Sequence, residues 1–581
     1  MSRAMRWTAG FLALLVLILL PVVTGPYLVG LGFLLLVAFV LAQSWDWIGG
    51  EAGYINLGHL VFYGIGAYAF SILLVRGVPL PACFVAAGVL STVAAALLAF
   101  PLFRLHGDYF AFGTLALLPL AELLAFNLTP VTGGADGIVL PPKYVLYPAY
   151  YCAVGLAVAT LVTTGVLAAS RFGYALRSIR NDELAAEVMG IRIFPKKGAV
   201  LALSAVFASL AGALQAWQLS YIDPPTVFGL NVALVPVAMA LLGGSGKRWG
   251  PLIGVILLFA LQQWLLVNIT ALQATVYGTV ILMIGRFMPG GLLRSRLVRS
   301  TPGVRGLAGE YHHELTVLKD ESTEQELPIA RMSGQCGRPL LEVRELTMRF
   351  GGNIAVNAVN LTIREGEIVG LVGANGSGKT TLFNCISRVY EAEGSIMFDG
   401  HDVKSLRRDE LSRRGLGRTF QNPRPFGDLT VAENIAIALT YGGDRTGFPD
   451  AFETAAAFAA FVGLKERLST RADALTLQEK KGLELARALA LKPKLLLIDE
   501  VASGLTPAEV RTFVGHIRAI RDTYGITVIW VEHIFSALAQ VVDRLIVLEQ
   551  GNVIADAPLS EALQDAGVLK SYLGAAPVHA A

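Results

Sequence analysis

Hydrophobic sequence runs almost without interruption through the first 290 or so residues of this 581-residue chain. Overall, 54% of the residues are hydrophobic, far more than in a water-soluble protein, so the chain requires lipid around it. Each apolar stretch approaches the roughly 20 residues that a helix needs to cross the hydrocarbon core. The sequence therefore predicts an all-α polytopic membrane domain over residues 1–293, with about ten spans near residues 8–23, 27–44, 58–75, 82–103, 109–126, 147–169, 198–218, 229–243, 250–268 and 271–288.

Charged residues between the stretches support this count, because cytoplasmic loops of membrane proteins are enriched in lysine and arginine. Ten spans that begin in the cytoplasm also end there, and Arg76 is the one exception to the pattern. Two stretches are also compatible with broken or re-entrant segments, since 229–243 is short and 109–126 contains Pro119 and Glu122. The cations on the predicted cytoplasmic side are Arg104, Arg171, Arg177, Arg180, Arg192, Lys196, Lys197, Lys247, Arg248, Arg294, Arg296 and Arg299.

The first apolar segment, from Thr8 to Val23, follows Arg3 and Arg6 and has two interpretations. It is compatible with a signal peptide. Because many further spans follow and no convincing small-residue cleavage site intervenes, we interpret it as a retained helix.

The composition becomes charged and polar at 294–338, which predicts a linker between two domains. We interpret His312 and His313 in this linker as solvent-exposed rather than as metal ligands, because the pair is isolated in a polar segment. The net charge of +3 and the lack of a basic block with aromatic residues predict no nucleic-acid binding. Four cysteines without C-x-x-C spacing indicate neither a zinc site nor a disulfide framework.

Predicted strands and helices alternate in residues 339–581, which form the second predicted domain. The apolar runs Leu495 to Ile498 and Thr527 to Val531 have the composition of buried strands. The alternation predicts an α/β domain with a largely parallel sheet, whose ligands bind at the carboxyl ends of its strands. The other predicted elements are strands at Leu341 to Thr347, Val359 to Ile363, Glu367 to Val372 and Ser395 to Phe398, and a helix after Lys379.

The segment that follows the strand ending at Val372 fits G-x-x-x-x-G-K-[ST] at every fixed position. Glycines in such a loop let backbone N–H groups surround phosphates, while Lys379 reaches their outer oxygens and the Thr380 hydroxyl can bind Mg²⁺. The order of strand, loop and helix predicts a nucleoside triphosphate site. Its predicted binding residues are Gly373, Asn375, Gly376, Ser377, Gly378, Lys379, Thr380 and Thr381.

Asp499 and Glu500 stand at the end of the apolar run that begins at Lys494. Taken alone, two acids after an apolar run are as compatible with an ordinary strand end as with a Mg²⁺ site. Because a complete phosphate loop precedes them in the same domain, these two acids predict a Mg²⁺ site. Asp499 would hold Mg²⁺, directly or through water, and Glu500 would polarise the attacking water.

Three further segments make the domain resemble an ABC transporter ATPase: Gln421 within Arg-Thr-Phe-Gln-Asn-Pro, the run Ser503 to Pro507, and His533. The resemblance implies that the nucleotide is ATP, that Phe350 stacks on adenine, and that Gln421 senses Mg²⁺ and the membrane domain. It also implies that Ser503 to Pro507 touches a partner ATPase and that His533 contacts the γ-phosphate. Taken singly, Phe350 is also compatible with a core residue, Gln421 with a loop cap and His533 with a hydrogen-bonded histidine after a strand.

Longer segments in both halves carry a more specific resemblance. They are Arg104 to Phe110, Thr132 to Ile138 and Arg180 to Gly190 in the first half, and Met348 to Val356, Gly417 to Phe426 and the region of Leu573 in the second. These segments resemble the permease and ATPase subunits of branched-chain amino acid importers. The resemblance implies a permease fused to its ATPase in the bacterial cytoplasmic (inner) membrane, with the ATPase in the cytoplasm. It also implies a second permease subunit and a separate extracytoplasmic solute-binding protein as partners.

One motif departs from the ABC pattern: family members carry L-S-G-G-Q or a near variant, whereas this chain has Leu475, Thr476, Leu477, Gln478 and Glu479. Thr476 and Glu479 have the spacing of a capping box, so a helix is predicted to begin here. In the family this loop faces the γ-phosphate on the opposite subunit, where Gln478 adds a side chain and Glu479 a negative charge. We therefore expect an asymmetric heteromer, in which a second ABC ATPase supplies an intact signature.

The cytoplasmic segment Arg180 to Gly190 is predicted to form a short amphipathic helix that docks into the ATPase groove near Gln421 and couples the two domains. Acids near the start of a helix are favoured by its dipole. A helix that lies in the membrane interface is the alternative. The predicted coupling residues are Arg180, Asp182, Glu183 and Leu184, with Ala185, Val188 and Met189 completing the apolar face.

The membrane half departs from the family pattern at two positions, so the sequence does not identify the transported solute. In an ungapped alignment with the family, Pro119 stands where a glutamate is usual and Glu122 where a basic residue is usual. Glu122 is a functional candidate, although pairing with a neighbouring helix explains it equally well. The leading hypothesis is ATP-driven import of branched-chain amino acids or a related small polar or acidic solute. The alternatives are transport of urea or aromatic acids, export, and a membrane-tethered ATPase that regulates or remodels partners.

Overall fold

The computed structural model divides the chain into two compact units. Unit 1 comprises Met1–Arg180 and Phe194–His313, and unit 2 comprises Asn181–Ile193 and Glu314–Ala581. The short segment 181–193 therefore belongs with the second half of the chain. The structure describes residues 3–141, 143–268, 327–329, 337–443, 446–533 and 535–562, with a few positions between 275 and 294.

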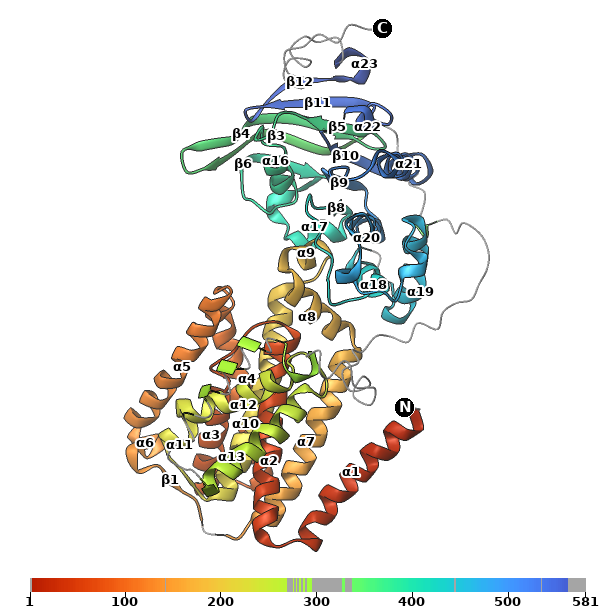
Figure 1. Cartoon of the computed structure of the whole chain (residues 1–581). Helices are drawn as coiled ribbons and strands as arrows, with labels where there is room; N and C mark the ends of the chain where they lie inside the picture. Colours follow the sequence, from red (N-terminus) through yellow and green to blue (C-terminus); the bar gives the residue numbers. More distant parts are fainter. Residues whose placement is uncertain are drawn as a thin grey trace. The chain divides into compact units, whose positions relative to one another are not determined.

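Unit 1 is helical, as its apolar composition predicts, and its only described strands are the two-residue pair β1 (Ile138–Val139) and β2 (Tyr221–Ile222). Helix α2 packs against α7, α12 and α13, and α3 packs against α4. Figure 1 shows these helices in red to yellow-green. The helices are α1 (Arg3–Val23), α2 (Pro26–Asp46), α3 (Leu60–Val75), α4 (Leu80–Leu102), α5 (Asp108–Asn127), α6 (Thr129–Thr132), α7 (Leu146–Ala169), α8 (Arg171–Asn181), α10 (Ile193–Leu219), α11 (Pro224–Phe228), α12 (Leu230–Gly243) and α13 (Gly250–Asn268).

Each predicted apolar stretch as far as 250–268 coincides with a helix, while 271–288 lies mostly outside the described residues. Within the described part of unit 1, six helical segments are long and apolar enough to cross a membrane. The predicted number of about ten spans therefore stays a prediction. The six segments are Pro26–Glu51, Leu80–Leu102, Asp108–Asn127, Leu146–Ala169, Ile193–Leu219 and Pro224–Gly243.

The two stretches for which a break was considered behave differently. Helix α5 continues through Pro119 from Asp108 to Asn127. In contrast, the stretch 229–243 is the second part of a broken helix, because the backbone at Gly229 leaves the helical conformation (φ −56°, ψ 134°) between α11 and α12. Gly229 could not carry a side chain here without approaching the Pro225 carbonyl oxygen, which lies 2.4 Å from the position of a Cβ atom.

Unit 2 contains the predicted parallel sheet, in the order β12-β11-β5-β10-β9-β8. All neighbouring strands in it are parallel except the edge strand β12. Strands β5, β9 and β10 are buried at every position, which explains their uninterrupted apolar sequences. The strands are β5 (Ile368–Val372), β8 (Leu416–Arg418), β9 (Leu495–Asp499), β10 (Thr527–Val531), β11 (Arg544–Glu549) and β12 (Asn552–Pro558).

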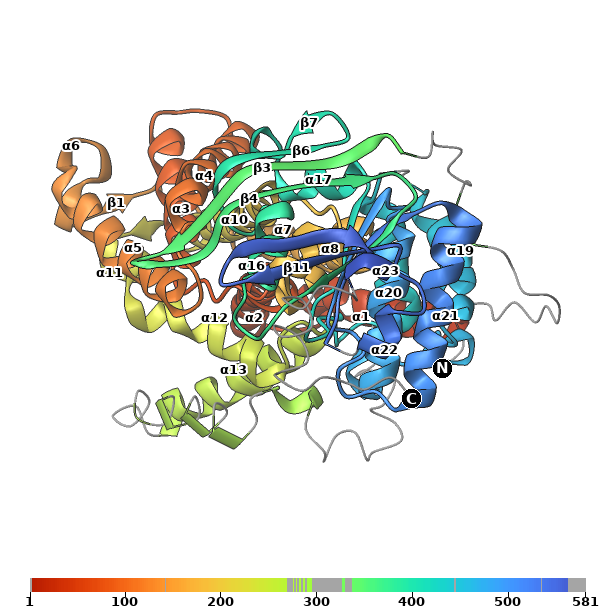
Figure 2. The same ribbon diagram turned by 90° about the horizontal axis from the view of Figure 1, so that it is seen from above.

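Three of the predicted strands lie in a second, antiparallel sheet rather than in the parallel one. Its order is β4-β3-β6-β7, with β3 (Pro339–Phe350), β4 (Asn353–Arg364), β6 (Glu393–Phe398) and β7 (His401–Asp402). Figure 2 shows β3 and β4 running side by side. Only Gly351 and Gly352 join these two strands, and so short a connection enforces antiparallel pairing.

Helices make up the rest of the described secondary structure of unit 2. Helices α18, α19 and α20 pack against one another, and α17 packs against α9. The helices are α9 (Glu183–Val188), α16 (Lys379–Ile386), α17 (Arg408–Arg413), α18 (Val431–Tyr441), α19 (Phe448–Phe461), α20 (Leu477–Ala490), α21 (Pro507–Tyr524), α22 (Phe535–Leu538) and α23 (Leu559–Ala562).

Candidate nucleotide site and coupling segment

The phosphate loop leaves the carboxyl end of β5 and leads directly into α16. Lys379 is the first residue of that helix, and its side chain is buried. The Lys379 Nζ donates hydrogen bonds to the backbone oxygens of Gly373 at 2.8 Å and Ala374 at 2.9 Å. Burial lowers the pKa of Lys379, and the nearby charges of Glu500 and Asp499 oppose this shift. The loop thus curves around a buried ammonium group.

Close contacts with neighbouring strands explain two of the three glycines in this loop. All three have positive φ values: 154° at Gly373, 81° at Gly376 and 103° at Gly378. A Cβ atom would lie 2.2 Å from the Leu548 carbonyl oxygen at Gly373 and 2.3 Å from the Ala355 carbonyl oxygen at Gly378. At Gly376 a Cβ atom would meet nothing within 4 Å. The loop is therefore held tightly between β4 and β11.

The other predicted nucleotide-binding residues differ in exposure. Asn375 and Thr380 are exposed, Ser377 is buried and Thr381 is half-buried. Phe350 lies at the end of β3 with 45% of its surface exposed, which argues against the interpretation as a core residue. Its ring packs edge-on against Tyr390, with 5.2 Å between the ring centroids.

Asp499 ends β9 as a buried carboxylate. Its Oδ2 lies 3.7 Å from the Arg418 Nη2, and its Oδ1 is buried without a hydrogen-bond partner among the described residues. Burial raises the pKa of Asp499 to about 6, although Arg418 opposes this effect. An unpaired buried carboxylate oxygen beside a phosphate loop, together with the exposed Thr380, fits the oxygen ligands that Mg²⁺ prefers. Arg418 was not among the site residues predicted from the sequence, because the three-residue strand β8 that buries it gives no periodic signal.

Glu500, Gln421 and His533 come together at the carboxyl ends of the parallel strands. The Glu500 Oε2 accepts a hydrogen bond from the Gln421 Nε2 at 2.6 Å, and its Oε1 lies 2.7 Å from the His533 Nε2. Glu500 has an unusual backbone conformation for its residue type, with φ at 45°. Because β8, β9 and β10 are adjacent and parallel, residues that follow them meet at one edge of the sheet.

The unusual signature segment forms the predicted capping box. The Glu479 backbone N–H donates to the Thr476 Oγ1 at 3.3 Å, and the Thr476 N–H donates to the Glu479 carboxylate at 2.8 Å. These bonds lower the pKa of Glu479, which also pairs with Arg467 at 3.1 Å. Leu475 is buried, whereas Leu477 and Gln478 are exposed in the first turn of α20. Glu479 therefore carries a negative charge at the start of this helix.

Two buried charged residues that were not predicted from the sequence hold residues 501–503, at the start of the run Ser503 to Pro507. The Lys481 Nζ, from α20, donates to the backbone oxygens of Val501 at 2.6 Å and of Ser503. The Glu532 carboxylate accepts the Ala502 N–H at 2.5 Å. A lysine on the apolar face of α20 and an acid directly after β10 were the signals in the sequence.

The predicted helix over Arg180 to Gly190 is wrong in its bounds, because the chain breaks at Asp182 into α8 and α9. Asp182 is extended (φ −160°, ψ 116°), and its carboxylate accepts the Ala185 N–H at 2.8 Å, so that it caps a new helix. Arg180 belongs to unit 1, where its Nη1 donates to the Gly50 carbonyl oxygen at 2.5 Å. Glu183 lies in the first turn of α9.

Helix α9 packs its apolar residues into unit 2. Ala185, Val188 and Met189 are buried, and Leu184 is half-buried. The Asp182 Oδ2 accepts a hydrogen bond from the Arg424 Nη1 at 3.0 Å. Arg424 follows Gln421 by three residues, so this hydrogen bond ties the segment to the loop that contains Gln421.

The phosphate loop, the buried Asp499 and the cluster of Gln421, Glu500 and His533 define an ABC-type ATPase, joined in one chain to a helical membrane unit. Residues 27–285 match the family described as the permease component of the branched-chain amino acid transport system. Residues 356–503 match the ABC transporter family.

Individual relatives agree with these matches. Over 253 residues the chain is 35% identical to the high-affinity branched-chain amino acid transport ATP-binding protein BraF of Pseudomonas aeruginosa, a match that covers 41% of this chain and 99% of BraF. The corresponding protein LivG of Escherichia coli K12 is 34% identical over the same shares. A nucleotide-free ATP-binding cassette from an ABC transporter is 26% identical over 41% of this chain and all of that structure, with a TM-score of 0.37. The chain belongs to the ABC transporter family, as a permease and an ATPase fused in one polypeptide.

Proposed function

We propose that this chain is the permease and ATPase subunit of an importer in the bacterial inner membrane, with its ATPase in the cytoplasm. Its solute would be a branched-chain amino acid or a related small polar or acidic molecule, as the names of its relatives suggest. The proposal rests on one observation: the Glu500 carboxylate is hydrogen-bonded to both Gln421 and His533, beside the phosphate loop. The proposed domain bounds are 1–293 for the permease, 294–338 for the linker and 339–581 for the ATPase.

The proposed roles in ATP hydrolysis combine this geometry with the resemblance to ABC transporter ATPases. Lys379 and the N–H groups of the loop bind the phosphates, and Phe350 stacks on adenine. Bound Mg²⁺, held by Asp499 and Thr380, would offset negative charge on the phosphates. Glu500 polarises the attacking water.

The hydrogen bonds around Glu500 fix the position of its carboxylate. Its Oε1 lies within hydrogen-bond distance of the His533 Nε2. Gln421 donates from the opposite side and links Glu500 to the loop that contacts α9. A shift of this loop therefore changes how Glu500 is held, which is the proposed link between hydrolysis and docking. Arg180, Asp182, Glu183 and Leu184 are the proposed coupling residues.

The proposed partners are a second permease, a second ABC ATPase with an intact signature and an extracytoplasmic solute-binding protein. The departure at Gln478 supports the second ATPase. Gln478 is exposed at the start of α20, and Glu479 adds a negative charge beside it. In a homodimer, each of the two sites would place Glu479 of one subunit opposite the γ-phosphate bound to the other subunit. Two negative charges facing each other in this way are electrostatically unfavourable.

Uptake into membrane vesicles tests this proposal. Labelled leucine and a panel of small acids, aromatic acids and urea are offered with ATP, with and without candidate binding proteins, and a Lys379→Ala chain is the control. ATP-dependent uptake of leucine that needs a binding protein supports the proposal. ATP hydrolysis without movement of any solute would instead indicate a tethered regulatory ATPase, and outward movement would indicate export.

A further inference from the structure

Residues 181–193 are held on the ATPase domain by ion pairs as well as by apolar contacts. The Asp182 Oδ2 lies 3.0 Å from the Arg424 Nη1, and the Glu187 Oε2 lies 2.6 Å from the Arg408 Nη1. Both acids belong to the segment and both bases to the domain. The two pairs are separated by about one and a half turns of α9 and fall at its two ends.

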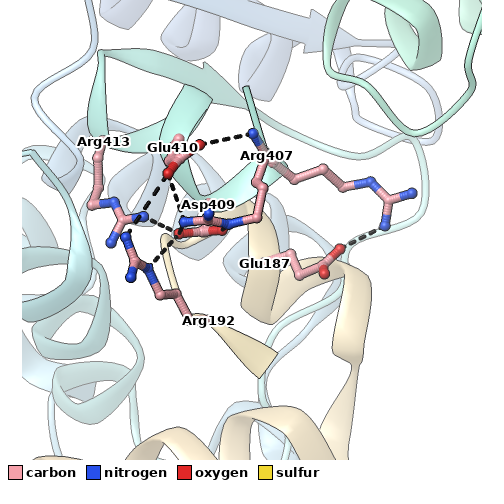
Figure 3. Close-up of polar contacts among 7 residues, drawn as sticks. Glu187, Arg192, Arg407, Asp409, Glu410 and Arg413 are labelled. Carbon is pink, nitrogen blue, oxygen red and sulfur yellow. Dashed lines mark hydrogen bonds and ion pairs between the residues drawn. The ribbon is translucent and has the colours of Figure 1, made fainter. Parts of the chain in front are cut away.

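A third pair reverses this order of charge. The Arg192 Nε lies 3.3 Å from the Asp409 Oδ2, and its Nη2 lies 3.8 Å from a Glu410 carboxylate oxygen. Asp409 is buried and also pairs with Arg407, at 3.0 Å, and with Arg413. Figure 3 shows these arginines converging on Asp409, with Glu410 beside it. The domain thus fixes an acid in place for the base of the segment.

The backbone approaches the domain closely between the second and third pairs. Gly190 has a φ value of 86°, and a Cβ atom there would lie 2.3 Å from the Tyr441 carbonyl oxygen. Because backbone meets backbone at this point, the segment has little freedom to slide along its site. A displaced segment would separate Glu187 from Arg408 and Arg192 from Asp409.

Asp182, Glu187 and Arg192 of the segment thus face Arg424, Arg408 and Asp409 of the domain. We propose that this order of charges, which we call the docking code, determines where the segment binds. The buried apolar residues supply contact area with little sequence preference, whereas misplaced charges in a part-buried site are strongly unfavourable. The code fixes the register of residues 181–193 and selects this ATPase domain over a partner ATPase that lacks these charges. The inference rests on the proposed coupling function, yet it concerns docking and needs no knowledge of the solute.

Hydrogen–deuterium exchange of residues 182–190 in the full chain tests the code. In the wild-type background, Glu187→Arg places two arginines together and should reduce protection about tenfold. In an Arg408→Glu background, the same Glu187→Arg change should increase protection, because opposite charges meet again. This reversal of sign does not depend on the other contacts of Arg408, to the backbone oxygens of Arg388 and Val389.

A matched control is the pair formed by Glu342 and Arg344, which has the same 2.6 Å separation but lies on β3. Glu342→Arg should leave protection of residues 182–190 unchanged, and ATP binding by every variant reports an intact domain. Protection that falls equally for Glu187→Arg in both backgrounds, or that never changes, would overturn the docking code. Failure of solute uptake by the wild-type protein would count against the proposed function alone.

Discussion

Replacing Gly378 by alanine should weaken ATP binding far more than the same change at Gly376. Both glycines have positive φ values in the phosphate loop, 103° and 81°. They differ in their surroundings, since a Cβ atom would lie 2.3 Å from the Ala355 carbonyl oxygen at position 378 and in open space at position 376. Comparing the two variants thus separates two free-energy costs. One is that of a side chain at a positive φ value, and the other is that of its close contact with the Ala355 carbonyl oxygen.

The expected magnitudes follow from these two terms. A side chain in the left-handed region costs about 1–2 kcal/mol, which applies at both positions. At Gly378 the contact with Ala355 must also be relieved by a shift of the loop or of β4, and forced shifts of this kind cost about 1–3 kcal/mol. Gly376→Ala should therefore weaken binding by roughly 5- to 30-fold and Gly378→Ala by at least about 30-fold.

The assay is calorimetric titration of the purified full chain with ATP and Mg²⁺. Circular dichroism of each variant provides the control for folding. Equal affinities for the two variants would refute the reasoning, because they would mean that close packing against β4 does not set the shape of the loop.

Two further outcomes are expected. Asp409→Asn should lower the melting temperature of the ATPase domain by about 5 °C, because three arginines lose their shared acid, although two of them are half-exposed and contribute less. The control Glu342→Gln, at a half-buried acid that pairs with the single Arg344, should change this temperature by less than about 1 °C, and equal shifts would contradict the argument. The purified chain alone should hydrolyse ATP at least about tenfold more slowly than a complex with an ATPase of intact signature, and equal rates would contradict the role given to Gln478.

The sequence predicted those parts of the fold that depend on local pattern. The phosphate loop and the strands that end at Val372, Asp499 and Val531 follow from apolar runs and a motif with fixed spacing, and the structure places them as predicted. The second sheet was not predicted, because a strand pattern does not specify the partner strand. Strand β8 was missed since its three residues are too short to give a periodic signal.

The candidate site was predictable in its residue types but not in its contacts. The motif order indicated Gln421, Glu500 and His533, whereas their meeting at one carboxylate depends on the adjacency of β8, β9 and β10. The break at Asp182 was missed, because an aspartate near the start of an amphipathic run fits both a first-turn acid and a cap. The contact of Arg192 with Asp409 joins residues 217 positions apart and has no signature in local sequence, whereas Arg407 and Arg413 are sequence neighbours of Asp409.

Glu500→Gln tests the central claim most directly, since glutamine keeps the shape of the side chain and removes its charge. The measurement is ATP-dependent solute accumulation in vesicles, made alongside ATP binding on the same preparation. Retained ATP binding with accumulation abolished is the predicted result, because the carboxylate that polarises water is lost. Accumulation at the wild-type rate would contradict the claim that hydrolysis at this carboxylate drives transport.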